Sequence, residues 1–209
     1  MINIISPQTT FIESSVKIGK NVTICPFNIL KGNTVIGDNV YLGPSNFICD
    51  SIIKPNTKIE YSYIQNSIIG KSCLIGPYSH IRPNSVIKNN VKIGNFVEVK
   101  NSIIGDNTKA SHLSYIGDAI IGKNCNIGCG AIFVNYNGTK KQNTYVQDNC
   151  FIGSNVNVIA PVKISKGTYI CAGSTLTQST KQNDFVVARS RETIKHNYAN
   201  KYFVKEKKE

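Results

Sequence analysis

The sequence predicts an all-β chain that winds as a single parallel β-helix, and three observations lead there. Ile-Gly occurs ten times and Leu42-Gly43 adds one more pair, so 11 of the 16 glycines follow a large aliphatic residue. These pairs recur at steps of six residues or near multiples of six, as from Ile36 to Leu42. Apolar residues show no helical period here, and a short fixed repeat is the signature of a solenoid.

Each six-residue unit is interpreted as a short strand with one large and one small inward residue. Two runs of aliphatic residues hold the large position, which are Ile69, Ile75, Ile81, Ile87, Ile93 and Val99, and Val146, Ile152, Val158, Ile164, Ile170 and Leu176. Such a strand cannot bury an apolar face alone, so three strands are expected to form one triangular coil. Stacking at about 4.8 Å then pairs each strand with those above and below, and residues 18 to 180 predict about nine coils.

Two features interrupt the repeat. The step from Phe133 to Val146 is 13 residues, so residues 134–145 are expected to leave the coil as an external loop. Insertions of this kind often build a binding face in solenoids, although a tolerated surface loop is the alternative. After residue 180 the repeat fades into a polar, basic segment. The predicted organisation is therefore a β-helix over residues 1–180 and a C-terminal arm over residues 181–209.

The composition argues against several classes of protein. The N-terminus lacks a signal-peptide pattern and no run of about 18 apolar residues occurs, so a cytoplasmic protein without a membrane segment is expected. The net charge of +12 is spread along the chain without an aromatic-interleaved motif, so no nucleic-acid partner is expected. A preference for small anions would account for the charge, and a solvated surface accounts for it better. Among the seven cysteines, Cys73, Cys125 and Cys150 fall on the small inward position, which favours a structural role.

His112 is the candidate proton acceptor. It lies two residues after the inward Ala110, at a position of the repeat that faces outward, and an imidazole can accept a proton from an attacking amine. Arg82 and Lys100 lie 18 residues apart, one coil, so they should stack about 5 Å apart as a phosphate clamp. A solvated charged face is the alternative for these cations. A three-histidine zinc site would need three histidines on the wall, and only His80 and His112 qualify, so no metal is expected.

Several sequence blocks resemble one family, and in chain order they are Ile81-Arg-Pro, Ile93-Gly-Asn-Phe-Val-Glu-Val-Lys100, Lys109-Ala-Ser-His-Leu-Ser-Tyr-Ile-Gly-Asp-Ala119, Asn126-Ile-Gly-Cys-Gly130, Asn135-Tyr-Asn-Gly138 and Ala160-Pro-Val. Over residues 15 to 190 the chain resembles the acetyltransferase half of the bifunctional glucosamine-1-phosphate acetyltransferase / N-acetylglucosamine-1-phosphate uridyltransferase family. The resemblance implies a left-handed helix, a hand that is rare among parallel crossovers and that periodicity does not fix. It also implies a homotrimer with active sites between subunits.

The activity implied by the resemblance is acetyl transfer from acetyl-CoA to the amino group of glucosamine 1-phosphate, a step of UDP-N-acetylglucosamine supply. In the catalytic step, His112 would be the general base and Glu98 would orient it. The acceptor would be bound by Arg82, Lys100, Tyr115 and Asn126. The residues implied for acetyl-CoA are Cys129, Asn135, Tyr136, Ser154, Ala172 and Arg189. Cys129 stands where the family usually has alanine, and the tail lacks the family's tryptophan.

The nucleotidyltransferase half of that family has no counterpart in this sequence, so uridylyl transfer and a magnesium requirement are not expected. Two alternatives stay open. The acceptor could be another amino sugar, such as a nucleotide-linked one. The chain could also be a non-catalytic β-helical partner of a separate nucleotidyltransferase.

Overall fold

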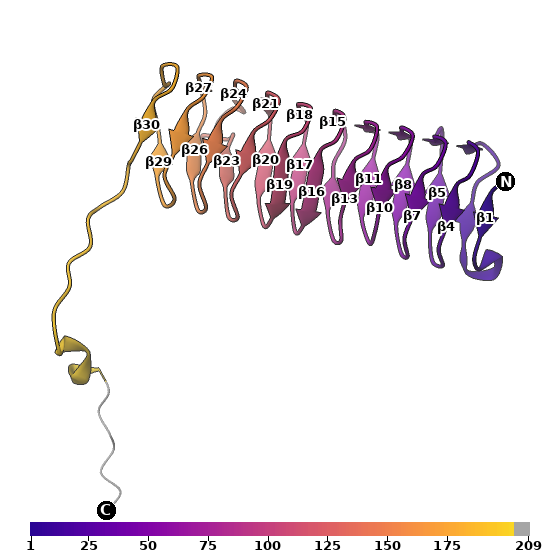
Figure 1. The fold of residues 1–209 in the computed structure, drawn as a ribbon, viewed down its shortest axis with the longest axis horizontal. Helices are drawn as coiled ribbons and strands as arrows, with labels where there is room; N and C mark the ends of the chain where they lie inside the picture. The colour runs from indigo at the N-terminus through magenta and orange to yellow at the C-terminus, as the bar shows by residue number, and fades with distance from the viewer. Residues whose placement is uncertain (203–209) are drawn as a thin grey trace, which may run out of the picture.

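The structure, a computed structural model, describes residues 1–202 as a long prism of stacked coils with an arm leading away from one end (Figure 1). The N-terminus lies at the opposite end of the prism. Residues 203–209 of the predicted arm lie outside the described part. The two helices of residues 1–202 are single 3-10 turns, η1 (Pro7–Thr9) and η2 (Tyr198–Lys201), and neither has the length or apolarity needed to cross a bilayer.

Three parallel sheets form the walls of the prism, and they contain 11, 10 and nine strands. Sheet A consists, in spatial order, of β1 (Asn3–Ile4), β4 (Thr23–Ile24), β7 (Tyr41–Leu42), β10 (Lys58–Ile59), β13 (Leu74–Ile75), β16 (Lys92–Asn95), β19 (Lys109–His112), β22 (Asn126–Ile127), β25 (Phe151–Ile152), β28 (Tyr169–Ile170) and β30 (Phe185–Val186). Sheet B consists of β2 (Phe11–Ile12), β5 (Ile29–Lys31), β8 (Phe47–Cys49), β11 (Tyr63–Gln65), β14 (His80–Ile81), β17 (Glu98–Lys100), β20 (Tyr115–Gly117), β23 (Ile132–Val134), β26 (Asn157–Ile159) and β29 (Thr175–Leu176). Sheet C consists of β3 (Lys17–Ile18), β6 (Val35–Ile36), β9 (Ile52–Ile53), β12 (Ile68–Ile69), β15 (Val86–Ile87), β18 (Ile103–Ile104), β21 (Ala119–Ile121), β24 (Thr144–Val146) and β27 (Val162–Ile164).

The chain visits sheets A, B and C in turn, and each strand pairs with the strands one coil away. In sheet B, for example, Ile81 pairs with Val99, which pairs with Ile116. These pairings confirm the predicted all-β parallel β-helix, and its hand is left, as the resemblance implied. The coils extend further than the repeat suggested, from β1 to β30 at Phe185–Val186, because a polar turn over residues 181–184 hides the last strand from the pattern. The predicted boundary at residue 180 thus falls inside the last coil.

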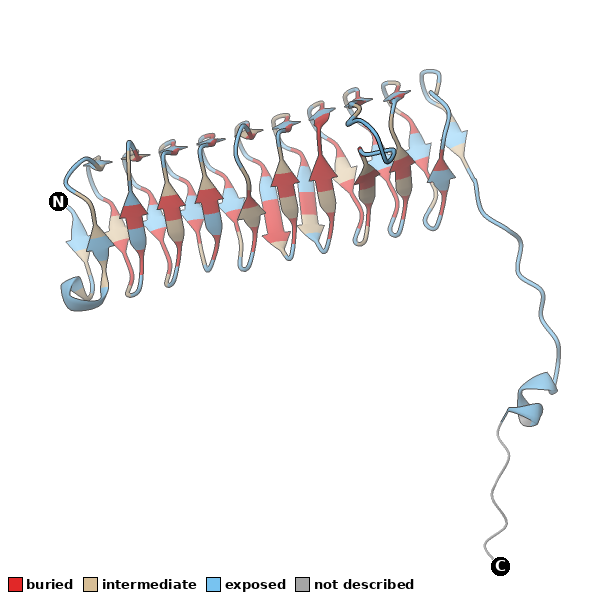
Figure 2. Cartoon of the chain, turned by 180° about the vertical axis from the view of Figure 1, so that it is seen from behind, coloured by how far each residue is buried: buried red, intermediate tan, exposed pale blue. Residues whose placement is uncertain are grey.

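The inward residues fill the prism with apolar columns, which Figure 2 shows as the buried parts of the strands between the two end coils. Cys73, Cys125 and Cys150 are buried, as their repeat position predicted. Each thiol donates to a backbone carbonyl of the next coil, at 2.9, 3.2 and 3.2 Å. Thr57 and Thr108 hold the same column and donate in the same way, at 2.7 and 2.8 Å. These cysteines therefore act as small hydrogen-bond donors in the core.

The corners of the prism use left-handed backbone conformations, and two of them favour asparagine. Between sheets C and A, stacked asparagines donate amide to amide, as from Asn107 to Asn124 at 3.1 Å. Asparagine tolerates this conformation and is common there. The corner between sheets B and C likewise carries Asn66, Asn84 and Asn101 with positive φ.

The corner between sheets A and B differs over part of its length, because from Phe27 to Leu113 five of its six left-handed positions hold apolar side chains and the sixth is Ser45. These residues, named the A–B ridge below, are Phe27, Tyr61, Tyr78, Phe96 and Leu113. All five are exposed, and the rings of Tyr61, Tyr78 and Phe96 follow one another at 5.5 and 5.7 Å. Bulky residues rarely adopt positive φ, and an exposed apolar surface, here unbroken from Tyr61 to Leu113, usually marks an interaction site.

Replacing Ile81 with alanine is expected to lower the free energy of unfolding by about 2–5 kcal/mol, because a cavity would remain in the inner column. Ile81 is fully buried, whereas Ile103 is 37% exposed on the outer surface of sheet C. The same change at Ile103 should cost less than about 1 kcal/mol. Urea unfolding followed by circular dichroism compares the two variants. Equal losses would contradict the assignment of inward and outward columns.

Candidate functional site

The outer surface of sheet B, called face B below, carries polar side chains on the neighbouring strands β14, β17 and β20. Outward residues stack in register, giving two columns, which are His80, Glu98 and Tyr115, and Arg82, Lys100 and Gly117. Because Ile81 pairs with Val99, the residues that follow them, Arg82 and Lys100, lie on adjacent coils. The spacing of 18 residues predicted this stacking.

Arg82 forms an ion pair with Glu98, with 2.8 Å between Nη1 and Oε1. Their side chains are 42% and 36% exposed, and a pair this open contributes only about 0–1 kcal/mol. Arg82 therefore remains able to exchange Glu98 for an anionic ligand. The ring of Tyr115 lies over Gly117, since a Cβ at that position would come within 2.5 Å of the tyrosine hydroxyl oxygen, so the glycine makes room for the ring.

A third cation, which the sequence analysis missed, joins these residues from the external loop. A surface groove of about 420 Å³ at the B–C corner is lined by Arg82, Pro83, Asn84, Lys100, Asn101, Asp118 and Lys141. Lys141 is 41 residues from Lys100 in sequence, so no repeat spacing could have linked them. Their proximity follows from the way the loop folds back over the corner.

The charges in this groove depend on one another. Burial opposes the charge on Lys100, but contact with the Lys141 amine and the Asp118 carboxylate outweighs burial, so the pKa of Lys100 is raised. The pKa of Lys141 is lowered, first by its contact with Lys100 and then by the repulsion between the two ammonium groups. An anion bound between them would relieve this repulsion.

His112 ends β19 at the A–B corner, where its ring is exposed to solvent. Its Nδ1 lies 2.6 Å from Oδ1 of Asn95, which occupies the same position one coil earlier. With this oxygen as acceptor, Nδ1 carries the proton and Nε2 keeps a free lone pair. The expected contact with Glu98 is not present, because that carboxylate pairs with Arg82. Asn95 holds the ring instead.

The histidine and the cations border face B from opposite edges. The sequence analysis placed the imidazole beside the two cations, and this arrangement is not found within one chain. The residue that pairs with Lys100 is Gly117, five residues after His112, and the A–B corner lies between. Five residues span at most about 17 Å, so the histidine and the cations are close enough for one ligand lying over Tyr115 to approach both.

Small residues continue the A–B corner beyond His112. Cys129, Ser154 and Ala172 take its position in the next three coils, as the corner hydrogen bonds Gly130 N to Leu113 O, Asn155 N to Cys129 O and Gly173 N to Ser154 O show. Arg189 lies one coil beyond Ala172 and beside this column, with its side chain packed near Gly173. The column thus extends about 19 Å from the imidazole, four coil steps of about 4.8 Å.

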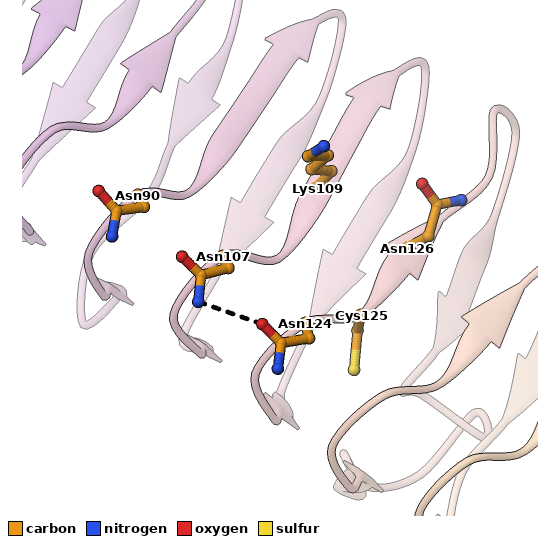
Figure 3. A pocket seen from close by; sticks show the side chains of 6 residues that line it. All are labelled: Asn90, Asn107, Lys109, Asn124, Cys125 and Asn126. Carbon is orange, nitrogen blue, oxygen red and sulfur yellow. Dashed lines mark hydrogen bonds between the residues drawn. The ribbon is translucent and has the colours of Figure 1, made fainter.

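The other predicted ligand residues lie elsewhere. Asn126 faces outward from sheet A, in a groove of about 490 Å³ that also contains Lys109 (Figure 3). Asn135 lies at the B–C corner, where its amide is nearly buried and donates to Asp118. Tyr136 is exposed in the loop and donates to the Gly138 carbonyl at 2.6 Å. The predicted acetyl-CoA residues are therefore divided between two corners of one chain, because the loop leaves from the B–C corner.

His80, the second histidine considered on the wall, stacks edge-on against Tyr63 with ring centroids 5.3 Å apart. Burial lowers its pKa, although Glu98 acts in the opposite direction. Within residues 1–202, no three His, Cys, Asp or Glu side chains gather closely enough to hold a metal ion.

Comparison with known proteins agrees with this architecture. The family described as the GMPPB C-terminal domain matches residues 3–85 and 65–186. A protein of Geobacillus sp. (strain WCH70) called bifunctional protein GlmU is 47% identical over 98% of this chain and 44% of its own length. The protein of the same name from Caldicellulosiruptor saccharolyticus is 50% identical over 94% of this chain and 42% of its own length. The chain thus spans less than half of these curated relatives.

Solved structures agree on the fold. LpxA, a UDP-N-acetylglucosamine acyltransferase from Bacteroides fragilis, aligns over 84% of this chain and 68% of its own, with a TM-score of 0.61 and 21% identity. The Arabidopsis UDP-N-acetylglucosamine acyltransferase gives a TM-score of 0.52 at 20% identity, with the same coverage.

The repeat and the coil geometry define a hexapeptide-repeat protein with a left-handed β-helix. Within that class, the chain belongs to the GMPPB C-terminal domain family. The resemblance to the acetyltransferase half of the bifunctional GlmU proteins, which the sequence blocks predicted, is confirmed.

Replacing Lys141 with alanine is expected to weaken binding of inorganic phosphate about tenfold, because one charge-assisted contact in the groove is lost. Isothermal titration calorimetry at low salt measures the effect. Lys140→Ala is the matched control, since this exposed neighbour in the loop is not among the residues lining the groove. Equal weakening by both changes would contradict a specific role for Lys141.

Proposed function

We propose that this chain transfers the acetyl group of acetyl-CoA to the amino group of glucosamine 1-phosphate, giving N-acetylglucosamine 1-phosphate. The observation that carries the proposal is face B, which has an oriented, exposed histidine at one edge and a cluster of cations at the other. An acceptor with an amine and a phosphate separated by a sugar ring matches this spacing. The resemblance to the acetyltransferase half of the bifunctional family, described in the sequence analysis, implies the same acceptor.

In this proposal the phosphate binds Arg82, Lys100 and Lys141, whose charges converge on one groove. The sugar lies over Tyr115 and directs its amine towards His112. Phosphate bound to Arg82 would displace Glu98, which leaves that carboxylate free to turn towards the histidine edge. The orienting role expected for Glu98 therefore belongs to the ligand-bound state of the proposal.

The chemical step is a direct attack on the thioester. The amine nitrogen forms a bond to the acetyl carbon while Nε2 of His112 accepts its proton. Asn95 accepts the hydrogen bond from Nδ1 and so favours the imidazolium that forms. Breakdown of the tetrahedral intermediate breaks the carbon–sulfur bond, and the CoA thiolate leaves and takes up the proton. The protein contributes alignment and one proton acceptor.

Acetyl-CoA is proposed to lie along the A–B corner. Cys129, Ser154 and Ala172 have small side chains there, so an extended pantetheine arm can follow the column from His112. Arg189 at the far end would meet a CoA phosphate. Asn126, Asn135 and Tyr136 face other directions in the same chain, so in this proposal a neighbouring copy presents them.

A homotrimer with sites between copies is part of the proposal. The A–B ridge ends at Leu113, directly after His112, and its exposed rings offer an apolar surface for a second copy beside the catalytic column. A neighbour seated there would also cover the acetyl-CoA column and limit access of water to the thioester.

His112→Ala is expected to lower turnover at least about 100-fold, the usual range for loss of a general base, without changing assembly. Release of CoA thiol from acetyl-CoA, with and without glucosamine 1-phosphate, measures the rate. His196→Ala, in the exposed arm, is the control and should keep wild-type turnover. A His112→Ala enzyme at the wild-type rate would remove the base from the mechanism.

The same assay tests the acceptor. If the protein releases CoA only with a nucleotide-linked amino sugar, the acceptor assignment is wrong although the transferase class stands. Failure of acetyl-CoA to bind at all would instead favour a non-catalytic β-helical partner of a nucleotidyltransferase.

Phe96→Asp is expected to convert the assembly to monomers and to lower turnover at least about tenfold, because a charge would be buried against the second copy. Light scattering measures the mass, and circular dichroism checks that the coils remain. Ile103→Asp places the same charge on exposed sheet C and should leave the mass unchanged. An unchanged mass for Phe96→Asp would exclude the ridge as the interface.

A further inference from the structure

Asp118 is a nearly buried carboxylate, 5% exposed, at the B–C corner beside the groove. Its Oδ1 accepts a hydrogen bond from the Asn101 amide at 2.5 Å. Its Oδ2 accepts from the Asn135 amide and forms an ion pair with Lys100 at 3.4 Å. Burial raises the pKa of Asp118, but these three partners outweigh it, so the pKa is lowered and the group is held as an anion.

Asp118 also fastens both ends of the external loop. Its side chain holds Asn135, where the loop begins, and its backbone carbonyl accepts from the Thr144 amide at 3.2 Å, where the loop ends. The loop closes on itself between these points, since Gln142 N donates to Asn135 O at 2.7 Å. Lys141 is carried by this closed loop, so its place in the groove depends on the attachment at Asp118.

The backbone does not require a charge at this corner. Asp118 has a φ of 49°, and Asn66, Asn84 and Asn101 adopt the same left-handed conformation in the preceding coils. Asparagine therefore satisfies the turn. The negative charge at Asp118 therefore serves something other than the turn. Of the groups that its carboxylate contacts, the Asn101 amide is neutral, whereas Lys100 is a cation and the loop held through Asn135 carries another, Lys141.

We propose that Asp118 is a positioning residue that holds Lys100 and the loop-borne Lys141 together as one phosphate-binding pair. Two ammonium groups in one groove repel each other, and a fixed carboxylate beside them offsets that repulsion before the ligand arrives. The phosphate then meets cations already in place. This inference rests on the proposed function only for the identity of the acceptor.

The test is Asp118→Asn, which preserves size and the left-handed conformation and removes the charge. It is expected to raise the KM for glucosamine 1-phosphate about tenfold, with kcat and the KM for acetyl-CoA changed less than about twofold. Asp50→Asn is the matched control, because Asp50 has the same conformation at the same corner, with φ 47°. Its carboxylate accepts a hydrogen bond from the backbone N–H of Asn33 and has no lysine partner among the ion pairs of residues 1–202. It should leave all constants unchanged.

A double-mutant cycle separates positioning from stability. If Asp118 acts through the lysine pair, Asp118→Asn should weaken phosphate binding about tenfold in the wild type and much less in a Lys141→Ala background. Calorimetry with inorganic phosphate reads this without acetyl transfer, so it remains decisive if the proposed activity fails. Additive losses, or a lower melting temperature with unchanged phosphate affinity, would overturn the proposal.

Discussion

Everything in this protein depends on the hydrogen bonds that join each coil to the next. The strands are two to four residues long and pair only with strands one coil above and below. A residue's column is therefore set by register, and the column decides whether its side chain is inward, outward or at a corner. His112, Cys129 and Ser154 share one column although 42 residues separate the first from the last. Stacking converts a sequence period into a spatial line of functional groups.

The sequence was sufficient wherever the period was intact. It predicted the inward columns, the buried Cys73, Cys125 and Cys150, and the stacking of Arg82 on Lys100, because each follows from counting residues within a coil. Counting does not fix how far apart two columns lie around the prism. His112 and Lys100 therefore looked adjacent in sequence analysis but border face B from opposite edges.

Where the chain leaves the coil, the period gives no information at all. Lys141 reaches the groove because the loop folds back on Asp118. The distance between these two residues in the sequence does not correspond to the repeat, so it could not predict their proximity. The Asn95–His112 contact was predictable in principle, since the two residues are 17 apart at equivalent positions. The step from Val99 to Ile104 is five residues instead of six, which hid this contact. The resemblance directed attention to Glu98, which pairs with Arg82.

A solenoid filled by its own side chains has no interior in which to place a reaction. Its chemistry must occur on an outer wall, where water screens charges and weakens every polar contact. Face B answers part of this difficulty within one chain, because Asp118 is buried and holds its partners in a less hydrated setting. The imidazole has no such protection, since His112 lies at an exposed corner. In the A–B ridge beside it, bulky residues adopt left-handed backbone conformations, which cost conformational energy, although their side chains are not buried within the chain. A second surface that covers the ridge and the corner together would bury these side chains and so offset that cost.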